Sequence, residues 1–85
     1  MMRTIADARA NDDWTVDVVF SDGEVRCFDL KPWLQDEAFE ALSDLQSFKR
    51  IKNGGYFIEW ASGADLSADT LYHLSRARAL SVARP

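Results

Sequence analysis

The stretch WTVDVVFSDGEVRCFDL, Trp14 to Leu30, predicts a β-hairpin. Apolar residues alternate with other residues from Trp14 to Phe20, and β-branched residues are frequent there, which is typical of a half-buried strand. Asp22-Gly23 follows, and this pair is common in two-residue type I′ turns. The second strand of the hairpin is then expected over Glu24 to Leu30.

A two-residue turn fixes which residues face each other across the hairpin. It places Val18 opposite Cys27 and Phe20 opposite Val25. Because side chains alternate between the two faces of a strand, one face is expected to be apolar and to hold Trp14, Val16, Val18, Phe20, Val25 and Cys27. The opposite face is expected to hold Asp17, Val19, Arg26 and Phe28.

Two further segments flank the hairpin. Thr4 to Ala10 is a short strand candidate that ends at the turn formers Asn11 to Asp13. After the hairpin, Pro32 ends the strand because it cannot donate a ladder hydrogen bond. Apolar residues at helical spacing then predict one or two short helices. Asp36 is the candidate N-cap of the first of these helices and Ser43 of the second.

A second hairpin is predicted around the turn Asn53-Gly54-Gly55, since Tyr56, Ile58 and Trp60 alternate after it. Trp60 and Trp14 are expected in the core, whereas Trp33 is expected to be partly exposed.

The segment EWASGADLSADTLYHL, Glu59 to Leu74, carries three signals for the start of a helix. Ser67 fits the N-cap, Asp69 lies in the first turn near the positive end of the helix dipole, and Leu66 with Leu71 forms a hydrophobic staple. The helix is expected to reach about Leu80, with Arg76 and Arg78 in its last turns.

The same segment also offers candidate site residues, and the structural interpretation is preferred for each. Asp65 is expected to bind turn amides after Gly63. Asp65 and Asp69 are an alternative Mg²⁺ pair, although such sites usually also need substrate phosphates. The single histidine, His73, is expected to form a surface pair with Asp69 rather than to act as a general base.

The chain of 85 residues is expected to form one domain over 1–85. The pattern predicts an α+β fold: a small antiparallel sheet made of a strand and two hairpins, short helices in the middle and one C-terminal helix. The predicted core residues are Val16, Val18, Phe20, Phe39, Leu42, Ile58 and Leu71.

Charge and cysteine content narrow the possible functions. The net charge is −4, and residues 1–50 hold eleven acidic against six basic side chains. This excess suits a solvated surface or, alternatively, a face that docks a basic partner. Binding to nucleic-acid phosphate is disfavoured. One cysteine, Cys27, cannot form an internal disulfide, so a cytoplasmic protein is expected, and no apolar run is long enough to cross a membrane. Cys27 itself is expected to be a buried small hydrophobe.

The segments VVFSDGEVRCFDLKPWL, AFEALSDLQSFKRI and IEWASGADLSADTLY together resemble the small bacterial family known as domain of unknown function 2442. The resemblance covers about residues 3 to 75 and departs from the family at Ala68, where proline is common. It implies a small α+β domain without an established activity, and a gene often paired with another small gene, as in toxin–antitoxin systems. Longer relatives carry a helix-turn-helix, for which this chain is expected to have no room.

These observations favour a noncatalytic, antitoxin-like interaction module that binds a small partner protein, possibly co-encoded. An acidic decoy of a nucleic-acid-binding complex, similar to phage inhibitors of nucleases or CRISPR complexes, is the alternative. No enzymatic activity, cofactor, metal, membrane contact or direct DNA binding is expected, and a homodimer is an open possibility. The candidate partner-binding residues are Asp12, Asp13, Asp17, Lys31 and Trp33.

Overall fold

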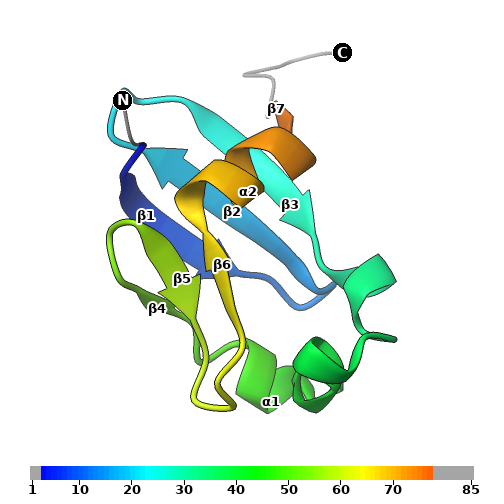
Figure 1. Ribbon diagram of the computed structural model, residues 1–85. Helices are drawn as coiled ribbons and strands as arrows, with labels where there is room; N and C mark the ends of the chain where they lie inside the picture. Colours follow the sequence, from blue (N-terminus) through cyan, green and yellow to red (C-terminus); the bar gives the residue numbers. More distant parts are fainter. Residues whose placement is uncertain (1–2, 78–85) are drawn as a thin grey trace.

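The computed structural model describes residues 3–77, which form two antiparallel sheets with short helices (Figure 1). The larger sheet has the order β1-β2-β3-β7 and the smaller one β4-β5-β6. The strands are β1 (Ile5–Ala10), β2 (Thr15–Phe20), β3 (Val25–Asp29), β4 (Lys52–Asn53), β5 (Phe57–Glu59), β6 (Asp65–Ser67) and β7 (Arg76–Ala77). The 3-10 helices are η1 (Lys31–Trp33) and η2 (Glu37–Ser43), and the α-helices are α1 (Leu45–Phe48) and α2 (Ala68–Leu74). The predicted α+β fold is confirmed, and the second hairpin, together with β6, forms a separate sheet.

The hairpin of β2 and β3 forms as predicted, but its loop has three residues rather than two. The Phe20 N–H donates to the Glu24 carbonyl at 2.8 Å, and the Gly23 N–H donates to the Phe20 carbonyl at 2.8 Å. Gly23 has a φ of 91°. This is a type I turn followed by a left-handed glycine, a common three-residue hairpin loop. The predicted two-residue turn is therefore wrong.

The longer loop shifts the register by one residue and exchanges the two faces of β3. Val18 lies opposite Arg26, not Cys27. Phe28 consequently enters the core with 1% of its surface exposed. Cys27 and Val25 lie on the outer face and are only half-buried, so the prediction of a buried Cys27 is wrong.

Trp14 closes the β1–β2 loop in the left-handed region, with a φ of 62°. A side chain with a Cβ costs about 1–2 kcal/mol in this conformation, which is why Gly23 occupies it in the next loop. The Trp14 indole Nε1–H donates to the Leu42 carbonyl at 2.8 Å, and its ring stacks on Phe48 with centroids 6.4 Å apart. These contacts hold Trp14, half-buried, against the core despite the strained backbone.

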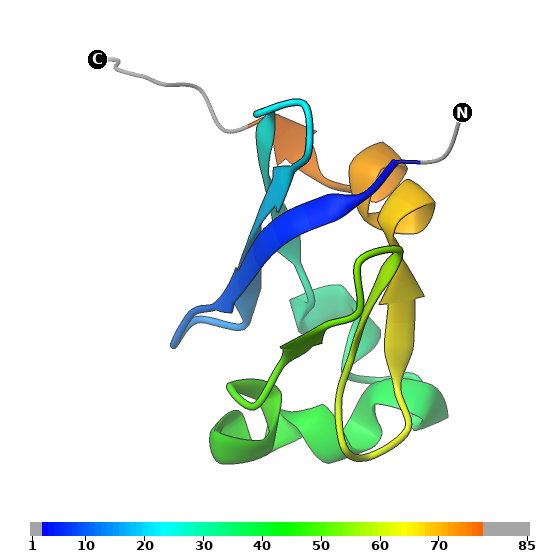
Figure 2. The same ribbon diagram turned by 90° about the vertical axis from the view of Figure 1, so that its left-hand side faces the viewer.

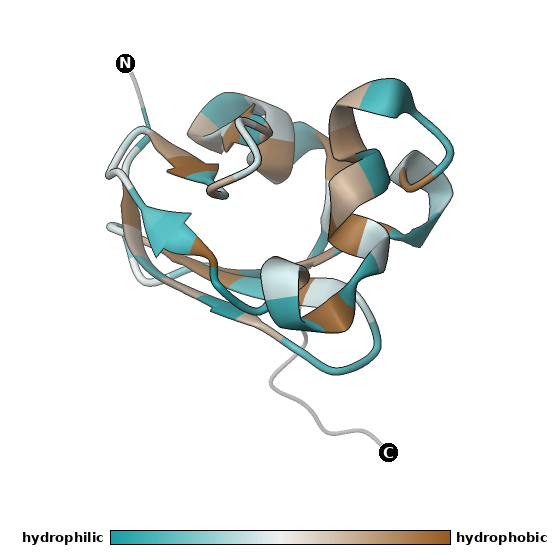
Figure 3. Cartoon of the chain, turned by 90° about the horizontal axis from the view of Figure 1, so that it is seen from below, coloured by the Kyte–Doolittle hydropathy of each residue, from teal (hydrophilic) through white to brown (hydrophobic). Residues whose placement is uncertain are grey.

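The core lies between the two sheets and is closed at one end by the short helices (Figure 2). Figure 3 shows hydrophobic segments on both sheets and on the helices around this interior. Trp60 is buried as predicted, and its indole Nε1–H donates to the Phe48 carbonyl at 2.7 Å. All seven residues predicted for the core are buried: Val16, Val18, Phe20, Phe39, Leu42, Ile58 and Leu71.

The middle helices begin at aspartates. Asp36 caps η2 as predicted, because its carboxylate accepts from the Ala38 N–H at 2.9 Å. The predicted cap at Ser43 is wrong, since α1 begins after Asp44. The Ser43 hydroxyl instead donates to the Glu40 carbonyl, which closes the end of η2.

The start of α2 is confirmed, but its predicted length is wrong. The Ser67 hydroxyl accepts from the Thr70 N–H at 3.1 Å, as expected of an N-cap. The helix ends at Leu74 because Ser75 adopts an extended conformation that leads into β7 beside β3. Arg76 therefore lies in a strand, and the predicted helix end, 78–80, lies outside the described residues.

The segment before α2 is a strand as well as a turn. Asp65 begins β6, exposed and opposite Glu59, and Leu66 is buried in the core. The hydroxyl of Ser62, rather than the Asp65 carboxylate, accepts from the Ala64 N–H at 3.5 Å. The predicted role of Asp65 in binding turn amides is therefore wrong.

Candidate protein-interaction surface

One face of the larger sheet points away from the core, and we call it the outer face. In Figure 2 the helices and the smaller sheet lie on the opposite side of this sheet. The strand register and the alternation of side chains place nine residues on the outer face: Asp7, Arg9, Thr15, Asp17, Val19, Val25, Cys27, Asp29 and Arg76. The outer face thus carries carboxylates and guanidinium groups beside three apolar side chains, those of Val19, Val25 and Cys27.

A groove of about 470 Å³ borders the outer face where β3 runs past the short strand β7. Leu74 at the end of α2 lines the groove and has 53% of its surface exposed. The residues that line the groove come from β2, β3, η1, the end of α2 and β7: Thr15, Cys27, Asp29, Pro32, Trp33, Leu74 and Arg76. The groove therefore combines apolar surface with one carboxylate and one guanidinium.

The η1 side of the groove is fixed by local sequence. Pro32 lies in the first turn of η1, where its missing N–H is not needed for a hydrogen bond. The Trp33 ring packs on Phe28 and Phe39 with centroid distances of 6.1 and 5.9 Å. Trp33 is half-buried, which confirms the expectation of a partly exposed side chain. One part of the indole is thus anchored in the core while another remains accessible in the groove.

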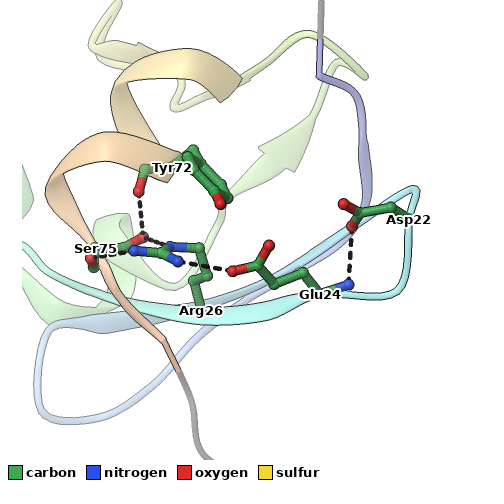
Figure 4. A network of polar contacts seen from close by, with 5 residues as sticks. All are labelled: Asp22, Glu24, Arg26, Tyr72 and Ser75. Atoms are coloured by element: carbon green, nitrogen blue, oxygen red, sulfur yellow. Dashed lines mark hydrogen bonds and ion pairs between the residues drawn. The ribbon is translucent and has the colours of Figure 1, made fainter.

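The opposite side is fixed by Arg26, which ties the end of α2 to β3 (Figure 4). Arg26 Nε donates to the Ser75 hydroxyl and Arg26 Nη2 donates to the Ser75 carbonyl, both at 2.8 Å. Arg26 Nη1 pairs with the Glu24 carboxylate at 2.7 Å, and the guanidinium lies 4.3 Å from the centroid of the Tyr72 ring. This network sets the position of Leu74, immediately before Ser75. The sequence interpretation missed it, because the predicted two-residue turn placed Arg26 on the face opposite to the core, whereas the observed register places it opposite Val18.

Three of the candidate partner-binding residues lie at the same end of the larger sheet. Lys31 Nζ donates to the Asp13 carbonyl at 3.2 Å and pairs with the Asp29 carboxylate at 3.0 Å. Asp12 is exposed in the same loop as Asp13 and pairs with Lys49. Lys31 and Asp29 connect this loop to the groove.

The other two candidates lie apart from that loop. Trp33 lines the groove, as described above. Asp17 lies on the outer face of β2 opposite Cys27, and its carboxylate accepts from the Asn11 side-chain amide at 3.2 Å. The candidates therefore extend along one end and one face of the larger sheet rather than converging on a single cavity.

Asp13 shows how its loop is held together. Its carboxylate accepts from the Thr15 hydroxyl at 2.6 Å and from the Thr15 N–H at 3.2 Å. The hydroxyl hydrogen bond is the main reason why the pKa of Asp13 is lowered from its usual value. The exposed carboxylate thus remains ionised near neutral pH.

The remaining candidate residues take structural positions. His73 Nε2 lies 3.4 Å from the Asp69 carboxylate on exposed helix surface, which agrees with the expected surface pair. Within residues 3–77 no group of three or more histidine, cysteine or acidic side chains is arranged to hold a metal ion. None of the helices in this part of the chain is long and apolar enough to cross a membrane.

Leu74 and Arg76 were missed as groove residues, since the helical periodicity was extended through both. Leu74 is exposed in the structure whereas Leu71 is buried, and no signal in the sequence distinguished the two leucines.

Comparison with known proteins identifies the family. The family model described as "Protein of unknown function (DUF2442)" matches residues 5–77, which includes every described strand and helix. No curated protein and no solved structure matches the chain. The match confirms the family suggested by the three sequence segments. The chain belongs to the DUF2442 family of proteins of unknown function.

Proposed function

We propose that this protein is a noncatalytic interaction module that binds a small partner protein through the groove and the adjoining outer face. The observation that supports this proposal is the groove itself, where exposed Leu74 and half-buried Trp33 line the same walls as Asp29 and Arg76. Large apolar side chains beside ordered charges are typical of protein-binding sites.

The groove suits an apolar side chain of the partner. Trp33 is anchored by Phe28 and Phe39, so an incoming side chain meets a surface that is already ordered. Preorganisation of this kind favours binding because less conformational entropy is lost on association. The charges of Asp29 and Arg76 at the same groove favour one orientation of the partner.

Acidic surface elsewhere favours a basic partner. Residues 35–46 contain no lysine or arginine, and their four carboxylates are exposed: Asp36, Glu37, Glu40 and Asp44. A field of one sign accelerates the encounter with a protein of opposite charge. The proposed partner is therefore a small, basic, cytosolic protein, encoded beside this one as in toxin–antitoxin pairs.

The exposed carboxylates of residues 35–46 also support a second candidate function. An acidic surface of this kind competes with nucleic acid for a basic binding channel. In this alternative the protein is a decoy that inhibits a nucleic-acid-binding complex. DNA or RNA would then displace the protein from its partner.

Co-purification with the small protein encoded beside it tests the proposal. The parent protein is expected to retain this partner, and Trp33→Ala is expected to lose most of it. Tyr56→Ala serves as the control for the loss of an aromatic side chain, because Tyr56 is exposed and does not line the groove. Equal retention by the parent and folded Trp33→Ala would contradict binding at the groove. Displacement of the partner by DNA or RNA would favour the decoy function instead.

A further inference from the structure

Two arginines lie against the ring of Tyr72 in α2, on the core side of the larger sheet. The guanidinium carbon of Arg3 lies 3.4 Å from the ring centroid, and that of Arg26 lies 4.3 Å from it. Phe20 packs edge-on against the same ring with centroids 5.5 Å apart. Tyr72 is half-buried, so its ring orientation is fixed by these contacts. None of the three residues Arg3, Arg26 and Tyr72 lines the groove described above.

The two guanidinium groups concentrate positive charge. Their carbons can be no farther apart than the sum of the two distances to the shared centroid. That limit is below the Debye length of physiological salt, about 8 Å, so the repulsion between Arg3 and Arg26 is incompletely screened. Glu24 balances Arg26 through a 2.7 Å ion pair. One positive charge in this cluster, that of Arg3, is therefore left without an ion pair among residues 3–77.

The two arginines also differ in how many of their N–H donors are already used in hydrogen bonds. Arg26 uses Nε, Nη1 and Nη2 for contacts with Ser75 and Glu24. Arg3 makes no hydrogen bond and no ion pair with any residue of the described part of the chain; its described contact is the Tyr72 ring. A guanidinium stacked on an aromatic face keeps its N–H donors in its own plane, pointing outward. The donors of Arg3 are thus held in place and remain available.

We infer that Arg3, held over the Tyr72 ring in the positive field of Arg26, forms a binding site for an oxyanion, either a carboxylate or a phosphate group. The planar donors of Arg3 match the geometry of two oxygens on one acceptor group. A bound oxyanion would also relieve the repulsion between the two guanidinium groups. The site is separate from the groove and does not depend on the proposed partner.

Nuclear magnetic resonance of the arginine Nε–H groups tests this inference in the full chain. The protein is titrated with inorganic phosphate in one series and with acetate in another, with sodium chloride keeping the ionic strength constant. Saturable shifts are expected for Arg3 and Arg26 but not for Arg9, which is exposed on the outer face. Saturation in only one series identifies which of the two oxyanions the site takes.

Variants at Arg3 complete the test. Arg3→Met is expected to weaken oxyanion binding by about tenfold or more, as for the loss of a charged hydrogen bond. Arg3→Lys keeps the charge but lacks the planar donors, so it is expected to weaken binding as well. Arg9→Met is the matched control and should bind as the parent does. Shifts that do not saturate, or equal affinity in the parent and both Arg3 variants, would overturn the inference.

Discussion

Replacing Arg26 by methionine tests whether one side chain holds the end of α2 against β3. Methionine keeps much of the apolar stem of arginine but removes the guanidinium. The change eliminates two hydrogen bonds to Ser75, the ion pair to Glu24 and the contact with the Tyr72 ring. Within the described part of the chain, the segment from Ser75 to Ala77 would then be joined to β3 by the short β7 pairing.

The expected loss of stability follows from these contacts and from their exposure. A hydrogen bond to a charged group contributes about 1.5–3 kcal/mol when its partner stays buried. The side chains of Arg26 and Glu24 are 16% and 33% exposed. After the substitution, Glu24 and the Ser75 carbonyl can therefore form hydrogen bonds with water, which offsets part of the lost free energy. We therefore expect Arg26→Met to lower the free energy of unfolding by about 2–3 kcal/mol. For a domain of this size that corresponds to a fall in Tm of about 10–20 °C.

Urea unfolding followed by tryptophan fluorescence measures this change. Arg9→Met is the matched control, because it replaces the same side chain by the same residue at an exposed position in β1. Its effect is expected to stay within about 0.5 kcal/mol. A double-mutant cycle with Ser75→Ala isolates the coupling between Arg26 and Ser75 and should give at least about 0.5 kcal/mol. Equal losses for Arg26→Met and Arg9→Met would refute this reasoning.

Four further predictions concern the core, two loops and a helix cap. Leu71→Ala removes a fully buried side chain and should lower the free energy of unfolding by about 2–4 kcal/mol in urea titration; a loss below about 0.5 kcal/mol would place Leu71 at the surface. Gly23→Ala should lower the free energy of unfolding by about 1–2 kcal/mol in the same assay. The cause is the positive φ of Gly23 alone, since an added Cβ meets no atom within 4 Å. An unchanged stability would contradict a left-handed conformation at this position. Ser67→Ala should cost about 1 kcal/mol by thermal unfolding, and no change would argue against the N-cap. The hydrogen bond from Thr15 lowers the pKa of Asp13, so ionised Asp13 stabilises the fold above pH 3.8, and this contribution is lost as the pH falls through the folded pKa. The difference in the free energy of unfolding between the parent and Asp13→Asn should therefore shrink below pH 3.8. A difference that does not depend on pH would contradict this prediction.

Elements with strong periodic signals could be predicted from the sequence, but the register of the first hairpin could not. Asp22-Gly23 is compatible with a two-residue turn and with a three-residue loop, and both place a glycine at positive φ. Tertiary contact accompanies the longer loop: the Ser21 N–H donates to the Thr4 carbonyl at 2.9 Å, and the two hydroxyls are also in contact. The loop therefore pairs with the chain just before β1, which lies far away in sequence.

The short strands β6 and β7 could not be predicted, because two or three residues carry no measurable periodicity. For β7, the helical pattern of α2 continued through Leu74 to Arg76 without a break in sequence. The helix ends where Arg26 binds Ser75, a contact between residues 49 positions apart. This tertiary interaction outweighs local helix propensity.

The same cause limited prediction of the candidate site. Trp33 and Lys31 were identified from the predicted bend over Lys31 to Leu34, and they border the groove or connect to it. Leu74 and Arg76 complete the groove only because the chain turns out of the helix. A groove with walls from residues about 40 positions apart depends on tertiary packing, which the sequence pattern does not contain.

The most direct measurement of the central claim is the affinity of the co-encoded partner for two matched variants. Leu74 and Tyr56 each expose 53% of their surface, but only Leu74 lines the groove. Isothermal titration calorimetry should show that Leu74→Ser weakens binding at least about tenfold, as expected for an apolar contact residue, while Tyr56→Ser binds as the parent does. Unchanged affinity for folded Leu74→Ser, together with a loss for Tyr56→Ser, would contradict the proposal and place the interaction surface on the smaller sheet.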